Sequence, residues 1–211
     1  MIHLYYFPTP NGQKITILLE ELGIPYQLHK IDITKNEQFS PEFLKISPNN
    51  KIPALVDDDV LFNNSALTIF ESGAILTYLA EKHGQFLPNQ LIEKTKIFEW
   101  LYWQVGGIGP IFGQLGFFHV RSTEKSPLAI NRFLEESHRL LNVMDIQLGK
   151  NTYLAGNNYS IADIAVYPWV NAIKTYIKEP LLSELNTKKN ILNWLNLVGQ
   201  REAVKKGLAA N

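Results

Sequence analysis

Two pairs of polar residues stand where helices should begin, and they are the residues of this chain best suited to chemistry. Thr9 and Asn11 lie in the turn-forming segment 7–12 (FPTPNG), directly before a helical pattern. Glu71 and Ser72 stand at the start of a second such pattern. The N-terminus of a helix carries a partial positive charge and N–H groups without helical partners, so it favours anions. The sequence therefore predicts two places at which a negatively charged group would be stabilised.

The two pairs suit different anions. A hydroxyl or amide donor at the first pair would favour a thiolate over a thiol, whose ordinary pKa is about 8.5. Lowering that pKa by one to two units needs about 1.4 to 3 kcal/mol, which one hydrogen bond and a helix end can supply. At the second pair, Ser72 and its amide can hold a carboxylate while Glu71 pairs with an ammonium, as in an α-amino acid. The structural alternative is that Thr9 and Ser72 only cap their helices.

A proline before a short apolar run marks a third candidate element, in residues 49–56 (NNKIPALV). Pro53 cannot donate to a sheet ladder, so it belongs at a turn or an edge. If its bond is cis, the N–H and C=O of Ile52 face outward, and an extended peptide could pair with them. Lys51 and Gln38 lie in loops that could reach the opposite end of such a ligand. For Lys51, a solvated surface charge is the alternative.

The chain contains no cysteine. This excludes a disulfide framework and a thiolate metal site, so any thiol chemistry must use sulfur brought in by a ligand. No metal site is predicted either, because none of the five histidines has metal-ligand spacing: His3, His29, His83, His119 and His138.

The overall composition limits the classes of partner. Twenty Lys and Arg balance twenty Asp and Glu, so nothing suggests nucleic acid or an anionic membrane. With 45% hydrophobic residues the chain can bury a sizeable core. No apolar run approaches the roughly 18 residues that span a bilayer, and the first residues do not resemble a signal peptide. We therefore expect a cytoplasmic protein.

Predicted strands and helices alternate in the first part of the chain. The pattern predicts a thioredoxin-like α/β domain in the order βαβ, short helix, ββα. Asp57 to Asp59 and Asn63-Asn64 are expected to be turns, and Ala74 is expected to face inward from its helix. The predicted strands are 2–6, 26–33, 54–56 and 67–70, and the predicted helices lie around 15–22, at 41–46 and at 71–82.

From Leu91 onward only helical spacing remains. We assign residues 1–84 to the thioredoxin-like domain and 92–211 to an all-helical domain, with a linker at about 85–91. The segment 106–110 (GGIGP) should interrupt the first long helix, and a second helix should span about 128–148. Ser160 and Asp163 have the spacing of a capping box, for which we favour a purely structural role.

Two further features of the helical part could serve a ligand. Aromatic residues between Trp100 and Phe118 are expected mainly in the core and in an interface, but part of them, with His119, could wall an apolar pocket for a second substrate between the domains. Arg132 is an isolated cation on the second helix of this domain, for which a surface position is the alternative.

Taken together, these motifs resemble those of a known family. The chain is similar over nearly its whole length to bacterial glutathione transferases, and specifically to the nu class, whose members act as glutathione-dependent disulfide-bond reductases. The segments that carry the resemblance are 8–12 (PTPNG), 39–43 (FSPEF), 47–54 (SPNNKIPA), 70–75 (FESGAI), 103–107 (WQVGG) and 159–165 (YSIADIA).

The resemblance implies glutathione as the bound thiol and a role for each candidate residue. Ile52, before Pro53, would pair its backbone with the cysteinyl unit, and Glu71 and Ser72 would hold the γ-glutamyl head. The other residues that it assigns to glutathione are Asn11, Gln38, Lys51 and Arg132. Members of the class are similar in accommodating two glutathione units or glutathione disulfide, and a homodimer is implied.

Three functions follow as hypotheses. The leading one is disulfide reduction, in which Thr9 and Asn11 organise the glutathione sulfur, one thiolate attacks a small disulfide and a second glutathione resolves the mixed product. The alternative is a conjugating glutathione transferase that attacks an electrophilic carbon. A third hypothesis is a glutathione-binding regulatory module without catalysis.

Overall fold

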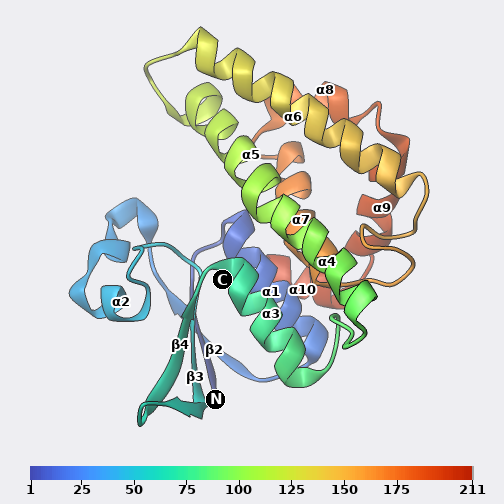
Figure 1. Ribbon diagram of the computed structural model, residues 1–211. Coiled ribbons are helices and arrows are strands. Elements are labelled where there is room, and N and C mark those ends of the chain that lie inside the picture. Colours follow the sequence, from blue (N-terminus) through green and yellow to red (C-terminus); the bar gives the residue numbers. More distant parts are fainter. Residues whose placement is uncertain (211) are drawn as a thin grey trace. The chain divides into compact units, whose positions relative to one another are not determined.

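A four-stranded sheet organises the first part of the chain in the computed structural model, which describes residues 1–210 (Figure 1). The order is β2-β1-β3-β4, with β1 parallel to β2 and antiparallel to β3, and β3 antiparallel to β4. One parallel crossover followed by a hairpin confirms the predicted thioredoxin-like layout. The strands are β1 (Ile2–Tyr6), β2 (Tyr26–Lys30), β3 (Ala54–Phe62) and β4 (Ser65–Phe70).

Contacts divide the chain into two compact units. The first contains residues 1–85 and 202–210, and the second contains residues 86–201. In the first unit, α1 (Pro10–Leu22) and α3 (Ser72–His83) lie on one side of the sheet and α2 (Pro41–Ile46) on the other (Figure 1). The second unit is mainly helical.

Helix α1 forms because its sequence carries both a start and a stop signal. Thr9 is its N-cap, proline stands in its first turn, and Gly23 ends it in the left-handed conformation with φ of 64°. Gly12 is required here because a Cβ atom would lie 2.3 Å from the carbonyl oxygen of Phe7. Helix α3 ends in the same way at Gly84. On α3 the expectation for Ala74 is wrong, since that residue is exposed.

The predicted turn at Asp57 to Asp59 is also wrong, because these residues lie inside β3. The strand continues to Phe62, with a register shift between Asp57 and Leu61. The predicted turn at Asn63 and Asn64 is confirmed, and both residues have positive φ angles, of 52° and 61°. The second strand is shorter than predicted and ends at Lys30, before two short 3₁₀ turns, η1 (Ile33–Lys35) and η2 (Glu37–Phe39).

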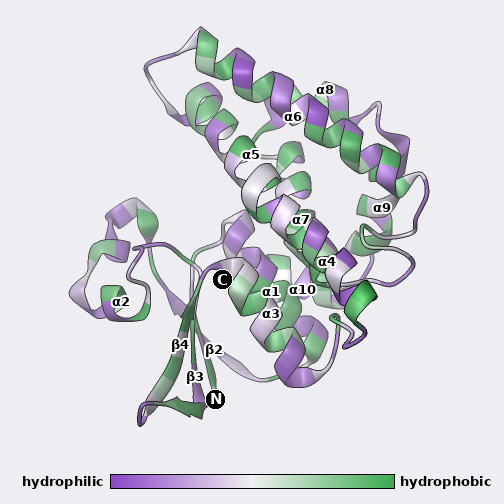
Figure 2. Ribbon diagram, viewed as in Figure 1, coloured by the Kyte–Doolittle hydropathy of each residue, from purple (hydrophilic) through white to green (hydrophobic). Residues whose placement is uncertain are grey.

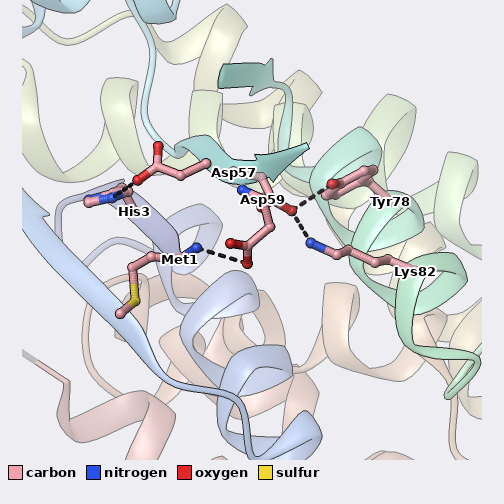
Figure 3. Close-up of polar contacts among 7 residues, drawn as sticks. Met1, His3, Asp57, Asp59, Tyr78 and Lys82 are labelled. Carbon is pink, nitrogen blue, oxygen red and sulfur yellow. Dashed lines mark hydrogen bonds and ion pairs between the residues drawn. The ribbon is translucent and has the colours of Figure 1, made fainter. Parts of the chain in front are cut away.

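Asp57 lies in the strand because its side chain has partners from another element. Its carboxylate is buried and accepts hydrogen bonds from the Tyr78 hydroxyl at 2.6 Å and from the Lys82 ammonium (Figure 3). Burial raises its pKa, but the hydrogen bonds from Lys82 and Tyr78 outweigh burial and hold the pKa below its usual value. The next two carboxylates are paired as well, Asp58 with His3 and Asp59 with the amino group of Met1.

The C-terminal helix α10 (Glu202–Ala209) packs against α1, although the sequence analysis assigned this segment to the helical domain. Thr16 Oγ1 donates to the carbonyl of Gly207 at 2.6 Å. Tyr6 donates to the carbonyl of Ala210 at 3.1 Å. Gly207 allows the close approach, because a Cβ atom there would lie 2.5 Å from the Cα atom of Ile17.

The second unit begins with an interrupted helix, as the glycine-rich segment predicts. Helix α4 (Leu91–Trp103) passes into the π-helical turn η3 (Gln104–Ile108), then into α5 (Gly109–Leu115) and a second π-helical turn, η4 (Gly116–Arg121). The second long helix, α6 (Pro127–Leu148), is confirmed, and apolar and polar residues alternate along it (Figure 2). The remaining helices are α7 (Ile161–Asn171), α8 (Lys178–Leu185) and α9 (Lys189–Gly199).

The capping box at the start of α7 is confirmed. Asp163 is fully buried and accepts hydrogen bonds from the N–H of Ser160 at 3.2 Å, the N–H of Leu154 at 3.0 Å and Trp194 Nε1 at 2.9 Å. Burial raises the pKa of Asp163 to about 6, although these donors oppose the shift. Within residues 1–210, no helix is both long and apolar enough to cross a bilayer.

Candidate functional site

A cleft of about 140 Å³ in the first unit brings together six of the nine predicted site residues. It lies where the N-termini of α1 and α3 meet the loop before β3. Ser47 and Phe70 also line it, and sequence reasoning named neither as a site residue. The six predicted residues are Asn11, Lys51, Ile52, Pro53, Glu71 and Ser72.

The α3 side of the cleft has a strained backbone. Glu71 is not glycine, yet its φ of 72° and ψ of 116° place it in a region that L-residues rarely adopt. Such a conformation costs about 1–3 kcal/mol and tends to occur at ligand-binding sites. Ser72, the next residue, is 8% exposed and begins the helix. The strain places an exposed carboxylate and a nearly buried hydroxyl next to each other on the same cleft.

The α1 side is organised by a cap. Thr9 Oγ1 accepts a hydrogen bond from the N–H of Gly12 at 3.3 Å, so Thr9 does cap α1, as the structural alternative for this residue held. Capping uses the hydroxyl only as an acceptor, and its single O–H donor is not consumed by the cap. Asn11 in the first turn lines the cleft, whereas Thr9 is not among the described residues that do so.

The loop before β3 is held by a buried serine. Ser47 is fully buried, and its hydroxyl donates to the carbonyl of Lys51 at 2.8 Å. The Ile52–Pro53 peptide bond is cis. Among residues 1–210, the N–H and C=O of Ile52 have no backbone hydrogen-bond partner. The sequence signal for Ser47 was its position directly before the Pro-Asn-Asn turn that leads into this loop.

A buried lysine lies behind the α3 side, and sequence reasoning missed it. Lys14 on α1 is 1% exposed, and its Nζ donates to Ser72 Oγ at 3.1 Å. Burial lowers the pKa of Lys14 to about 7, and the charge of Glu71 acts in the opposite direction. The helical spacing offered a signal, because Lys14 precedes the buried Leu18 by four residues and so shares its face.

Two predicted residues besides Thr9 lie outside the cleft. Gln38 is on η2, and its Oε1 atom is buried without a hydrogen-bond partner in the described part of the chain. Arg132 is exposed on α6 of the second unit. The expectation of a core position for most aromatic residues between Trp100 and Phe118 is wrong: Phe112 is fully buried, but Tyr102 and Phe117 are 67% and 44% exposed. No metal-binding group of three or more side chains occurs within residues 1–210.

The cleft offers a consistent set of partners for a short peptide. Glu71 can accept from an ammonium, and Ser72 with the first N–H groups of α3 can donate to a carboxylate. Ile52 presents main-chain groups to an extended backbone. Lys51 supplies a positive charge for a second carboxylate. The arrangement therefore suits a small zwitterionic peptide rather than an apolar molecule.

Comparisons with known proteins agree with this geometry. Residues 1–81 match the model of the glutathione S-transferase N-terminal domain, and residues 110–202 match that of the C-terminal domain. The disulfide-bond oxidoreductase YfcG of Escherichia coli K12 is 52% identical over 172 residues, which are 82% of this chain and 80% of that protein.

Two solved structures share the fold and contain ligands. A glutathione transferase family member from Pseudomonas fluorescens Pf-5, with two glutathione molecules bound, has a TM-score of 0.93 and 41% identity over 98% of this chain and 92% of its own. A glutathione transferase from Pseudomonas putida, with one glutathione disulfide bound per subunit, has a TM-score of 0.92 and 42% identity over 98% of this chain and 90% of its own.

Proposed function

This chain belongs to the glutathione S-transferase family, and from that premise we propose that it reduces disulfides with the sulfur of bound glutathione. The observation that carries the proposal is the cleft, where a site for an amino-acid head group adjoins the main chain of Ile52 in a chain without cysteine. A protein of this kind can exchange thiols and disulfides only with a borrowed sulfur.

The proposed pose follows the charges of the cleft. The γ-glutamyl ammonium lies against Glu71, and its carboxylate receives the Ser72 hydroxyl and amide. The cysteinyl unit pairs with the main chain of Ile52, beside Pro53, and Lys51 faces the glycyl carboxylate. The family resemblance assigns three further residues to the ligand: Asn11, Gln38 and Arg132.

The proposed reaction needs two glutathione molecules. The Thr9 hydroxyl and the Asn11 amide donate to the sulfur of the first and stabilise its thiolate. This thiolate attacks one sulfur of the substrate disulfide, whose S–S bond breaks to release one thiol and leave a mixed disulfide. A second glutathione thiolate attacks the glutathione sulfur of that product, which releases the other thiol and forms glutathione disulfide. The two electrons that reduce the substrate come from the two glutathione thiols.

The assembly and location belong to the same proposal. A homodimer is supported by the family resemblance and by Leu61 and Phe62 on the β3–β4 hairpin, which are 69% and 65% exposed. A cytoplasmic location is supported by the chemistry, because the cytosolic glutathione pool is kept reducing.

The test compares two substrates at saturating glutathione. We expect turnover of bis-hydroxyethyl disulfide to exceed that of an aryl halide such as chlorodinitrobenzene. A dominant aryl-halide rate would favour the conjugating transferase, in which the same thiolate attacks an electrophilic carbon. Binding of glutathione by calorimetry without turnover of either substrate would favour a regulatory module.

A further inference from the structure

The hydrogen bond between Lys14 and Ser72 constrains how the serine can meet a ligand. In its charged form Lys14 has three donors and no acceptor, so the Ser72 oxygen, 3.1 Å from Lys14 Nζ, is then the acceptor. A hydroxyl has one hydrogen to donate. Because that hydrogen cannot point at the ammonium, it is directed away from Lys14.

The orientation of the Ser72 hydroxyl hydrogen affects ligand binding because Ser72 also lines the cleft. Without Lys14, the hydroxyl could rotate and act toward a ligand as either donor or acceptor. With a charged Lys14 behind it, one lone pair of the Ser72 oxygen is occupied and the hydroxyl hydrogen is available to the cleft. A ligand carboxylate can accept that hydrogen.

A bound carboxylate would shift Lys14 toward its charged form. The lysine is almost completely buried, and burial disfavours its charge, while the neighbouring Glu71 supports it. A ligand carboxylate at Ser72 would add a second negative charge on the same side. Ligand binding and the charged state of Lys14 therefore reinforce each other.

We propose that Lys14 is a positioning residue for the carboxylate end of the ligand, because its ammonium fixes the Ser72 hydroxyl as a donor toward the cleft. This inference rests on the proposed function, since it takes the γ-glutamyl carboxylate of glutathione as the group recognised. Lys14 itself acts through Ser72 and is not required to touch the ligand.

The test uses glutathione and an analogue without that carboxylate, γ-aminobutyryl-cysteinylglycine, titrated by calorimetry into wild-type protein and Lys14→Met. Methionine has a similar length and no charge, and exchanging a buried charge for an apolar side chain is often tolerated by the fold. We expect Lys14→Met to bind glutathione about tenfold more weakly while its affinity for the analogue changes less than threefold. An equal loss for both ligands would indicate a merely structural lysine and overturn the proposal.

A second comparison tests whether Lys14 acts through Ser72. In a Ser72→Ala background the hydroxyl is absent, so Lys14→Met should change glutathione affinity less than threefold. A tenfold effect that persists in that background would overturn the proposed route. The matched control is Lys82→Met, which removes another lysine hydrogen bond in the same unit, to Asp57, and should leave the preference for glutathione over the analogue unchanged.

Two further outcomes are distinguishable. If Lys14→Met does not fold, Lys14→Gln is used in its place. Because an amide can accept as well as donate, the preference for glutathione over the analogue should still fall at least threefold. An unchanged preference would overturn the proposal. If wild-type protein binds neither glutathione nor glutathione disulfide, the proposed function fails, and the inference about Lys14 fails with it. If wild-type protein prefers glutathione and Lys14→Met keeps that preference, only the inference about Lys14 fails.

Discussion

Helices α3 and α7 both carry a serine at their N-terminus, but the two ends are completed in opposite ways. At α7, Ser160 caps the helix and Asp163 accepts from Ser160 in return, in a fully buried capping box. At α3, the N-cap is Glu71, whose side chain makes no capping hydrogen bond to a described residue and whose φ is 72°. The side chains at the start of α7 therefore supply its capping hydrogen bonds. The side chain of the N-cap of α3 supplies none, so N–H groups at that helix end can donate to a ligand in the cleft. Similar sequence signals thus produce a buried structural cap in one unit and part of the lining of a cleft in the other.

The largest change in free energy should come from removing the capping box of α7. Asp163→Ala removes the acceptor for Leu154, Ser160 and Trp194, which leaves buried donors without a partner. We expect the free energy of unfolding to fall by about 3–5 kcal/mol, measured by urea denaturation. Asp163→Asn keeps one acceptor oxygen and should lose less. A loss below about 1 kcal/mol for the alanine variant would show that the box contributes little to stability.

The corresponding change at α3 should affect binding instead of folding. Glu71→Gln removes the negative charge that we assign to the ligand ammonium, and glutathione affinity should fall about 30- to 100-fold, equivalent to about 2–3 kcal/mol. Glu71 is exposed, and the described interaction of its charge is with Lys14, so stability should change by less than about 1 kcal/mol. Calorimetry measures the affinity, and thermal unfolding measures the stability.

The control for this variant is Glu42→Gln. Glu42 also lies in the first turn of a helix, α2, and is exposed, but it does not line the cleft among the described residues. Its affinity for glutathione should stay within twofold of wild type. Equal losses in both variants would mean that any acidic residue at a helix start has this effect, and the contrast between the two ends would then be wrong.

What could be predicted from sequence follows from how local each signal is. The cap of α1 at Thr9, which was the structural alternative for that residue, and the capping box of α7 depend on residues close together in the sequence, and both are present. The strand position of the three aspartates of β3 was not predicted, because their own turn preference is overridden by distant partners such as Lys82, 25 residues away from Asp57.

Within the candidate site too, features that depend on neighbouring residues were predicted, and features that depend on distant residues were not. Six cleft residues belong to short motifs, but Lys14 donates to Ser72, which lies 58 residues along the chain. The return of α10 onto α1 depends on Gly207 meeting Ile17, which no local pattern reports. The positive φ of Glu71 was hidden for a different reason. Positive φ angles are usually predicted from glycine or asparagine, and this position has neither.

A smaller effect is expected at the helix start that we assign to the sulfur. Asn11→Ala and Thr9→Ala should each lower disulfide turnover at least about tenfold, equivalent to about 1.4 kcal/mol, because each removes a donor to the thiolate. Thr9→Ala should also cost about 1 kcal/mol of stability through the lost cap, while Thr9→Ser keeps both the cap and the donor. Unchanged steady-state rates in both alanine variants would remove these residues from the mechanism.

Asp163, which accepts from Ser160, and Lys14, which donates to Ser72, should give opposite pH dependences of stability. Burial raises the pKa of Asp163 to about 6 from its ordinary value of 3.8, so between these two values the folded chain holds a proton there that the unfolded chain has lost. The contribution of Asp163 to stability therefore decreases as pH rises through that window. Lys14 has the reverse shift, from 10.5 to about 7, so between those values the unfolded chain binds the extra proton.

For Lys14, stability should consequently rise with pH above about 7. We expect the difference in unfolding free energy between wild type and Lys14→Met to move in favour of wild type by up to about 1.4 kcal/mol from pH 8 to pH 9. Urea denaturation of both proteins at the two pH values measures this, and every other titrating group cancels in the difference. A difference that stays constant would show that Lys14 keeps its proton in the folded protein throughout this range. Lys14 would then donate to Ser72 as a charged ammonium throughout this pH range. The hydrogen bonding at the start of α3 would in that case be as constant as that of the capping box of α7.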